Sequence, residues 1–133
     1  MMGAMNGVAI PELFTFDTYI AKVLGLLCGQ VAGLCLGQEG PMAHIGAATG
    51  IFVLRLPVPG FEFLRNDTVR RRFIAAGFAA GIGVAFGAPI GGTLMAFELS
   101  LPNTFWRLET MWQTFYCSAF AMFTLAFFTD CYS

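Results

Sequence analysis

The stretch from Phe73 to Phe97 contains no charged side chain, and further apolar blocks run from about Tyr19 to Leu54 and from about Met111 to Phe128. Each block is roughly 20 residues or longer, enough to cross the hydrocarbon core of a bilayer or to enter it and turn back. Only 11% of the residues are charged, against about 25% in soluble domains. The blocks therefore predict an all-α integral membrane protein.

Glycine and proline interrupt the first two blocks in their interiors. Gly37–Pro41 divides the first block, and Gly87–Pro89 divides the second. Proline suits the first turn of a helix, because its missing N–H has no intrahelical partner there in any case. We therefore predict helices that begin near Pro41 and Pro89, inside the membrane. Broken helices at that depth must be buried in protein or line a wet cavity, and they mark binding sites in transporters.

Glu39 is the most informative single residue, because a carboxylate buried within an apolar block is a functional hypothesis by default. The start of a helix near Pro41 would carry about half a positive charge and unpaired N–H groups, so it favours an anion. The Glu39 carboxylate would occupy the position of a permeant anion, and its protonation would free that position. One residue would then be gate, pH sensor and proton carrier. The alternative is that Glu39 only decorates a helix start.

Two long motifs resemble those of the CLC family of chloride channels and chloride/proton exchangers, especially its intracellular eukaryotic members. The first is Gly37-Gln38-Glu39-Gly40-Pro41-Met42-Ala43-His44-Ile45-Gly46, which resembles the family motif G-[KR]-E-G-P-x-x-H-x-G. The second runs from Arg65 through Phe73 and Ala75-Ala76-Gly77 to Phe86-Gly87-Ala88-Pro89-Ile90-Gly91-Gly92. Weaker similarities at Asn6–Pro11 and Phe105–Leu125 extend the resemblance over nearly the whole chain.

The resemblance implies part of a CLC-type bundle of tilted and broken transmembrane helices, surrounded by a lipid bilayer. It also implies a homodimer in which each subunit passes chloride or another small anion, with interface helices within Phe86–Phe128. Glu39 corresponds to the family's gating glutamate. The residues expected around the bound anion are Gly37, Gln38, Glu39, Gly40, Pro41 and Met42.

Two departures from the family pattern bear on the mode of transport. Gln38 replaces the usual Lys or Arg, which removes a positive charge near the pathway. Leu99 follows Glu98 and occupies the position of the proton-transfer glutamate of exchangers. Because leucine cannot carry a proton, the sequence favours a voltage- or pH-gated passive chloride channel with Glu39 as its gate. A chloride/proton exchanger is the alternative. A truncated membrane scaffold that does not conduct is a further alternative, from a different class of function.

The arginines at 55, 65 and 70–72 cluster in one polar segment, and such an excess marks the cytoplasmic side. The predicted order is a helix and linker over 1–17, apolar helices over about 18–54, a cytoplasmic loop over about 55–70, a broken re-entrant pair over about 71–99 and a helix over about 104–129. The pair would return Leu99 to the arginine side. The abrupt ends and the missing anion-binding motifs of the family predict a piece of a longer protein that cannot complete a pore alone. Whether the membrane is intracellular, endosomal or lysosomal, or the plasma membrane stays open.

The remaining composition favours no other class of function. A net charge of −1 makes no case for nucleic acid. No nucleophile–base pair and no metal-ligand spacing is present, so the sequence predicts no enzyme, no catalytic residue, no metal and no cofactor, with chloride only as the transported ion. His44 is interpreted as a satisfied helix residue. The four cysteines are interpreted as packing residues rather than disulfides, namely Cys28, Cys35, Cys117 and Cys131.

Overall fold

The computed structural model describes residues 3, 14–35, 37–55, 66–100 and 107–132. Within residues 14–132 the described part of the chain forms five helices and no strand, which confirms the all-α fold class. The helices are α2 (Phe16–Val31), α3 (Glu39–Arg55), α4 (Asp67–Phe86), α5 (Pro89–Ser100) and α6 (Leu108–Tyr132). Most of the predicted helix and linker over 1–17 and of the predicted loop over 55–70 lies outside the described residues.

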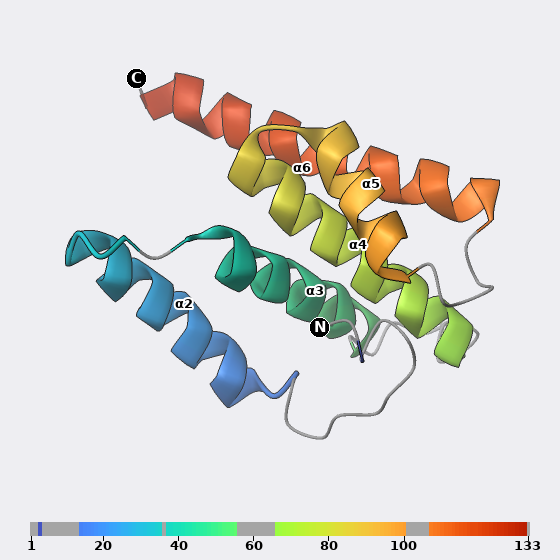
Figure 1. Cartoon of the computed structure of the whole chain (residues 1–133), viewed down its shortest axis with the longest axis horizontal. Coiled ribbons are helices and arrows are strands. Elements are labelled where there is room, and N and C mark those ends of the chain that lie inside the picture. Colours follow the sequence, from blue (N-terminus) through green and yellow to red (C-terminus); the bar gives the residue numbers. More distant parts are fainter. Residues whose placement is uncertain (1–2, 4–13, 36, 56–65, 101–106, 133) are drawn as a thin grey trace.

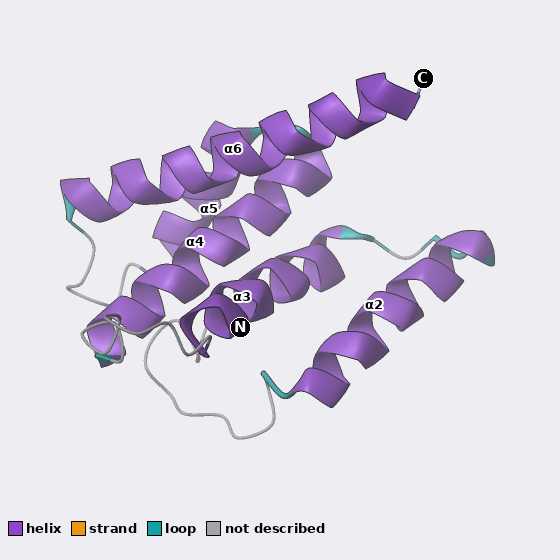
Figure 2. Ribbon diagram, turned by 180° about the vertical axis from the view of Figure 1, so that it is seen from behind, coloured by secondary structure: helices purple, strands orange, loops and turns teal. Residues whose placement is uncertain are grey.

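Helix α4 is the centre of the bundle. Helices α3, α5 and α6 all pack against α4, whereas α2 contacts α3 from the outside (Figure 1, Figure 2). The rings of Tyr19 and Phe52 make the α2–α3 contact, with their centroids 5.4 Å apart and their planes at 86°. This contact lies near the end of α3, so α2 diverges from the start of α3 (Figure 1).

A glycine separates α4 from α5, as the Gly87–Pro89 interruption predicts. Gly87 has φ 65°, a left-handed conformation that glycine adopts without strain. The N–H of Ala88 donates to the carbonyl oxygen of Gly83 at 2.9 Å, which closes the Schellman ending of α4. Helix α5 then begins at Pro89, where no N–H is needed. The prediction of a helix start at Pro89 is confirmed, and α5 runs back beside α4 (Figure 1).

Glycines allow α3 and α4 to touch through their backbones. A Cβ added at Gly46 would overlap the carbonyl oxygen of Gly77, and one added at Gly81 would overlap that of Met42. Small residues at helical spacing permit this close approach between membrane helices, where side chains gain little from leaving lipid. The glycines therefore set the position of α3, and of its N-terminus, relative to α4.

Hydroxyl side chains hold α6 against the bundle. The Ser118 hydroxyl donates to the carbonyl oxygen of Ala79 on α4 at 3.2 Å, over the space that Gly83 leaves empty. One and two turns earlier on the same face, Thr114 and Thr110 are also buried, and the Thr114 hydroxyl donates to the Thr110 carbonyl at 2.7 Å. Hydroxyls satisfied in this way can be buried in an apolar interface without the penalty of an unpaired donor.

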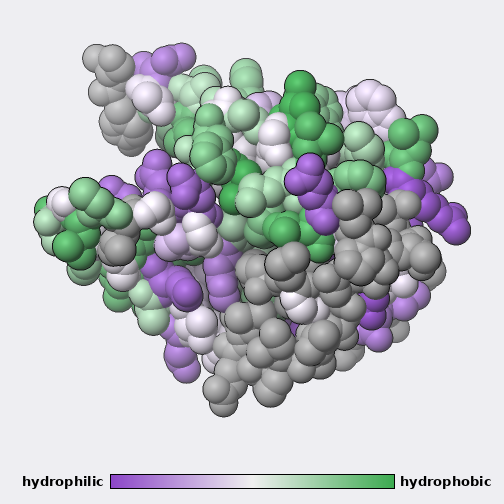
Figure 3. Space-filling model, in the orientation of Figure 1, coloured by the Kyte–Doolittle hydropathy of each residue, from purple (hydrophilic) through white to green (hydrophobic). Residues whose placement is uncertain are grey.

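Part of the outer surface of the bundle is apolar. Large exposed side chains gather on α5 and α6, and Figure 3 shows apolar residues over the face that α4, α5 and α6 form. By length and composition, Leu108–Cys131 is the one stretch of the described helices that could cross a membrane. At 1.5 Å per residue, α2 and α3 are about 24–26 Å long, shorter than the roughly 30 Å hydrocarbon core. The first apolar block is therefore divided into short helices.

Candidate anion site

The candidate site lies at the N-terminus of α3. The N–H of Met42 donates to the carbonyl oxygen of Gln38 at 3.0 Å, so Gln38 is the residue that caps the helix. Helix α3 begins at Glu39, and Pro41 stands in its first turn. The prediction of a helix start near Pro41 is confirmed to within two residues. A break of this kind aims the positive end of the α3 dipole at the segment that enters the helix.

The Glu39 side chain folds back over that entering segment. A Cβ added at Gly37 would lie 2.9 Å from Oε2 of Glu39, so the glycine leaves the space that the carboxylate occupies. A Cβ added at Gly40, by contrast, would meet nothing within 4 Å. Glu39 thus places its negative charge at the positive end of α3, which is where a free anion would also be stabilised.

The N–H groups at this end are not equally free. Pro41 has none, and that of Met42 is used within the helix. Because the first residues of a helix lack intrahelical acceptors, the N–H groups of Glu39 and Gly40 are the ones that face the entering segment. The Met42 N–H therefore already has an acceptor within the helix. The Met42 side chain instead lines a pocket on the other side of α3.

The enclosure of Glu39 differs from the expectation. Glu39 is exposed, as are Gly37, Gln38 and Gly40, so the prediction of a buried carboxylate is wrong for the described part of the chain. The reason is the course of α2, which touches α3 near Phe52 and leaves the start of α3 uncovered (Figure 1, Figure 2).

Leu99 lies on a different side of the bundle from Glu39. Helix α5 packs against α4 and α6 and returns toward the start of α4, as the expected antiparallel pair requires (Figure 1). Leu99 is half-buried and packs against the apolar core, whereas the preceding Glu98 is exposed. Position 99 therefore carries an apolar packing side chain at the arginine end of the bundle.

His44 and the cysteines show how the other candidate residues are placed. His44 is buried, and its ring centroid lies 5.8 Å from that of Phe14, which confirms its interpretation as a packing residue. The four cysteines are free and exposed, so their interpretation as packing residues is wrong for this chain. Three or more potential metal ligands do not gather anywhere among the described residues.

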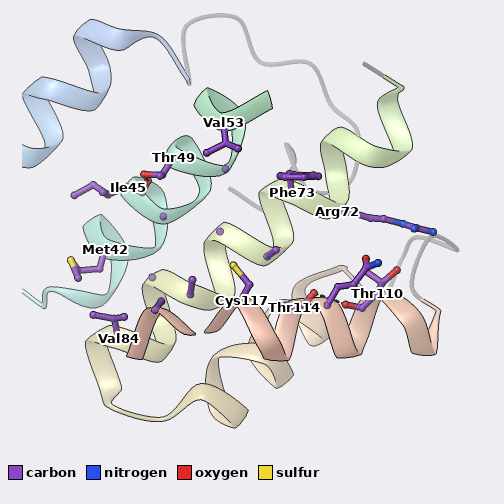
Figure 4. Close-up of a pocket in the computed structure, with 18 of the residues that line it drawn as sticks. Met42, Ile45, Thr49, Val53, Arg72, Phe73, Val84, Thr110, Thr114 and Cys117 are labelled. Atoms are coloured by element: carbon purple, nitrogen blue, oxygen red, sulfur yellow. Dashed lines mark hydrogen bonds between the residues drawn. The ribbon is translucent and has the colours of Figure 1, made fainter. Parts of the chain in front are cut away.

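The structure also contains a pocket that the sequence did not predict. Its volume is about 790 Å³, and residues of α3, α4 and α6 line it (Figure 4). Its floor is the face of α4 that carries Ala76 and Ala80, whose small side chains leave the space open. The spacing of four residues places these two alanines on one face of α4, and this was the only sign of the pocket in the sequence. The spacing does not tell which helices form the walls on the two sides of that face.

The sequence model of the voltage gated chloride channel family matches residues 1–132. This chain belongs to that family. The H(+)/Cl(-) exchange transporter 7 of Mus musculus is 41% identical to it over 135 residues, and that alignment covers 96% of this chain and 17% of the relative. The Homo sapiens protein of the same name is also 41% identical, with 96% of this chain and 16% of the relative covered. Chloride channel protein A of Dictyostelium discoideum is 38% identical over 129 residues, with 92% and 15% covered.

The voltage gated chloride channel family thus includes relatives named as exchangers and relatives named as channels. This chain spans about one sixth of the length of these curated relatives. Membership agrees with the apolar surface and with the candidate membrane span in α6.

Proposed function

We propose that this chain is the gate-bearing segment of a membrane protein that transports chloride or another small anion. The observation that carries the proposal is the position of the Glu39 carboxylate at the positive N-terminus of α3, in the space left by Gly37. A carboxylate and a chloride ion compete for the same field and the same N–H groups at such a terminus. Protonation of Glu39 would release the site to the anion, and this exchange makes Glu39 the gate.

The anion site is proposed to comprise Gly37, Gln38, Glu39, Gly40, Pro41 and Met42. Within it, the N–H groups of Glu39 and Gly40 are the donors best placed for an anion, because helix geometry leaves them without intrahelical acceptors. In a protein of the relatives' length, further segments would cover the exposed side of Glu39. Two copies of such a protein would form a homodimer in the bilayer, each with its own pathway.

Leu99 favours a passive channel. Its side chain packs against the apolar core and has no group that binds a proton. The competing proposal, a chloride/proton exchanger, is supported by the printed names of relatives that are 41% identical to this chain. Proton coupling in this protein would then need a titratable group other than position 99.

In a protein of the relatives' length that carries this segment, the reversal potential of the anion current in reconstituted vesicles separates the two modes of transport. A channel gives a reversal potential that follows the chloride gradient and does not move when a proton gradient is added. A shift with the proton gradient would contradict the channel and support the exchanger. The absence of any chloride flux would support the third reading, a membrane scaffold that does not conduct.

The role of Glu39 is tested by Glu39→Gln, which removes the charge and keeps the shape. We expect the variant to lose the dependence of chloride flux on pH. Glu109→Gln is the matched control, since Glu109 is an exposed carboxylate in the first turn of α6, also at a helix start. An unchanged pH dependence in Glu39→Gln, in protein that conducts, would remove Glu39 from the gate.

A further inference from the structure

The pocket between α3, α4 and α6 is an apolar groove with one polar end. Met42 and Val84 lie at one end of it, and Arg72 and Thr110 lie at the other (Figure 4). From Val69 to Val84 along α4 the groove extends about 22 Å, at 1.5 Å per residue. Its length and apolar walls suit an extended hydrocarbon chain, and its arginine end suits an anionic group.

Arg72 lacks a full set of partners within the described part of the chain. Its Nε atom is buried and has no hydrogen-bond acceptor among the described residues. The Arg72 guanidinium lines the groove and is always charged, so an occupant with anionic oxygens would be stabilised at this end. The planar guanidinium matches two phosphate oxygens, which makes phosphate a fitting partner.

The charge of the surrounding surface has the same sign. Helix α3 ends, and helices α4 and α6 begin, at this end of the bundle (Figure 1). The charged residues that the structure describes here are five arginines and four carboxylates: Arg55, Arg70, Arg71, Arg72 and Arg107, with Asp17, Asp67, Glu98 and Glu109. The excess of one positive charge favours an anionic headgroup, and basic pockets between membrane helices are known to bind such lipids.

The size of the groove suits a small ligand. The groove holds about 790 Å³, which is within the roughly 300–1,000 Å³ of small-ligand sites. A single acyl chain needs only the narrow space beside Ala76 and Ala80.

We propose that this groove binds one anionic phospholipid, with an acyl chain along α4 and the phosphate at Arg72. The inference rests on the membrane setting of the proposed function, but it assigns a ligand to a site that is separate from Glu39. The lipid would fill the space between α3 and α6 and so hold together the two helices that flank α4.

The two cysteines of α6 provide the test. Cys117 lines the groove, whereas Cys131 is exposed on the same helix outside it. The full chain is purified in a neutral detergent, and the rates at which N-ethylmaleimide alkylates the two thiols are measured by mass spectrometry.

Dioleoylphosphatidylglycerol and dioleoylphosphatidylcholine, which share their acyl chains, are titrated separately. We expect phosphatidylglycerol to slow alkylation of Cys117 at a concentration about fivefold lower than phosphatidylcholine requires. The reason is that one arginine near an anionic headgroup strengthens lipid binding by about this factor. Cys131 should respond equally to both.

Variants assign the effect to the two ends of the groove. Arg72→Gln should remove the preference for phosphatidylglycerol, and Arg70→Gln, at an exposed arginine that does not line the groove, should keep it. Ala80→Leu fills the groove and should abolish the lipid effect at Cys117, whereas Ala126→Leu on the exposed surface of α6 should not. If Arg72→Gln does not fold, Arg72→Lys should weaken the preference through loss of the planar fork.

Three results would overturn the proposal. The two lipids could act equally on Cys117, the two cysteines could be slowed alike, or Cys117 could be unreactive before any lipid is added. The last result would show that protein, either a helix or a second copy of the chain, fills the groove. None of these readouts involves chloride. Lipid dependence without chloride flux would therefore contradict only the transport proposal, and flux without lipid dependence would contradict only this one.

Discussion

Oε2 of Glu39 lies 2.9 Å from the point where a Cβ of Gly37 would stand. The glycine thus provides the space in which the carboxylate rests at the start of α3. The glycine of the motif therefore has a specific role, because it allows the negative charge of the proposed gate to lie at the start of the helix.

Gly37→Ala should therefore displace the Glu39 carboxylate from its resting position. We expect the pH at which chloride flux is half-maximal to shift, because the methyl group and Oε2 cannot both keep their places. Flux against pH in reconstituted vesicles measures the shift. Gly40→Ala is the matched control, since its Cβ would meet nothing within 4 Å. Equal effects of the two substitutions would contradict the proposed role of Gly37.

Leu99→Glu restores a titratable group at the position that distinguishes the two modes of transport. We expect the reversal potential to become sensitive to a proton gradient, because the new carboxyl can bind and release protons at the arginine end of the bundle. Leu99→Gln introduces similar polarity against the apolar core without a titratable group, and it should leave the reversal potential insensitive. The prediction does not survive if both variants, folded and conducting, behave as the unmodified protein does.

Gly77→Ala should loosen the contact between α3 and α4. The added methyl would overlap the carbonyl oxygen of Gly46, so the helices must separate, and overpacking of this kind typically lowers the free energy of unfolding by about 1–3 kcal/mol. Unfolding of the chain in detergent, followed by circular dichroism, measures the loss. Gly25→Ala in α2 has open space around it and should be neutral or slightly stabilising. If Gly25→Ala lowers the free energy of unfolding as much as Gly77→Ala does, the number of glycines in the helices, rather than the contact between α3 and α4, decides stability.

Ser118→Ala should weaken the attachment of α6. It removes the hydrogen bond to the Ala79 carbonyl, which in membrane helices is worth about 0.6 kcal/mol on average. Thr124→Ala serves as the comparison, because the Thr124 hydroxyl is exposed and donates to Phe120 within its own helix at 2.8 Å. The same unfolding measurement should place Ser118→Ala below Thr124→Ala in stability, and the reverse order would contradict the role of Ser118.

Features that depend on neighbouring residues could be predicted from the sequence. The left-handed turn at Gly87 and the helix start at Pro89 follow from the backbone preferences of glycine and proline. The start of α3 at Glu39, two residues before Pro41, shows the usual error of such a prediction at an element boundary. The position of His44 in the core also agreed, because a lone histidine in an apolar helix segment more often packs than binds a ligand.

Features that depend on which helices meet could not be predicted in this way. The exposure of Glu39 follows from the angle at which α2 leaves α3, and nothing near Glu39 in the sequence encodes that angle. That the Met42 N–H is used within α3 follows from the start of the helix at Glu39, which the sequence placed near Pro41. The exposed cysteines were misassigned because hydropathy locates an apolar segment without telling which of its faces meets protein.

By itself, the sequence determined that this protein is a set of broken apolar helices of the voltage gated chloride channel family, with a carboxylate at one break. Hydropathy, glycine and proline act over a few residues, so these conclusions needed no knowledge of packing. Only the tertiary structure decided that the carboxylate rests beside Gly37, that Leu99 packs against the apolar core, and that an apolar groove ends at Arg72. These relationships arise where segments distant in the chain come together, and the shapes of the contacting surfaces select among the many pairings that hydropathy alone permits.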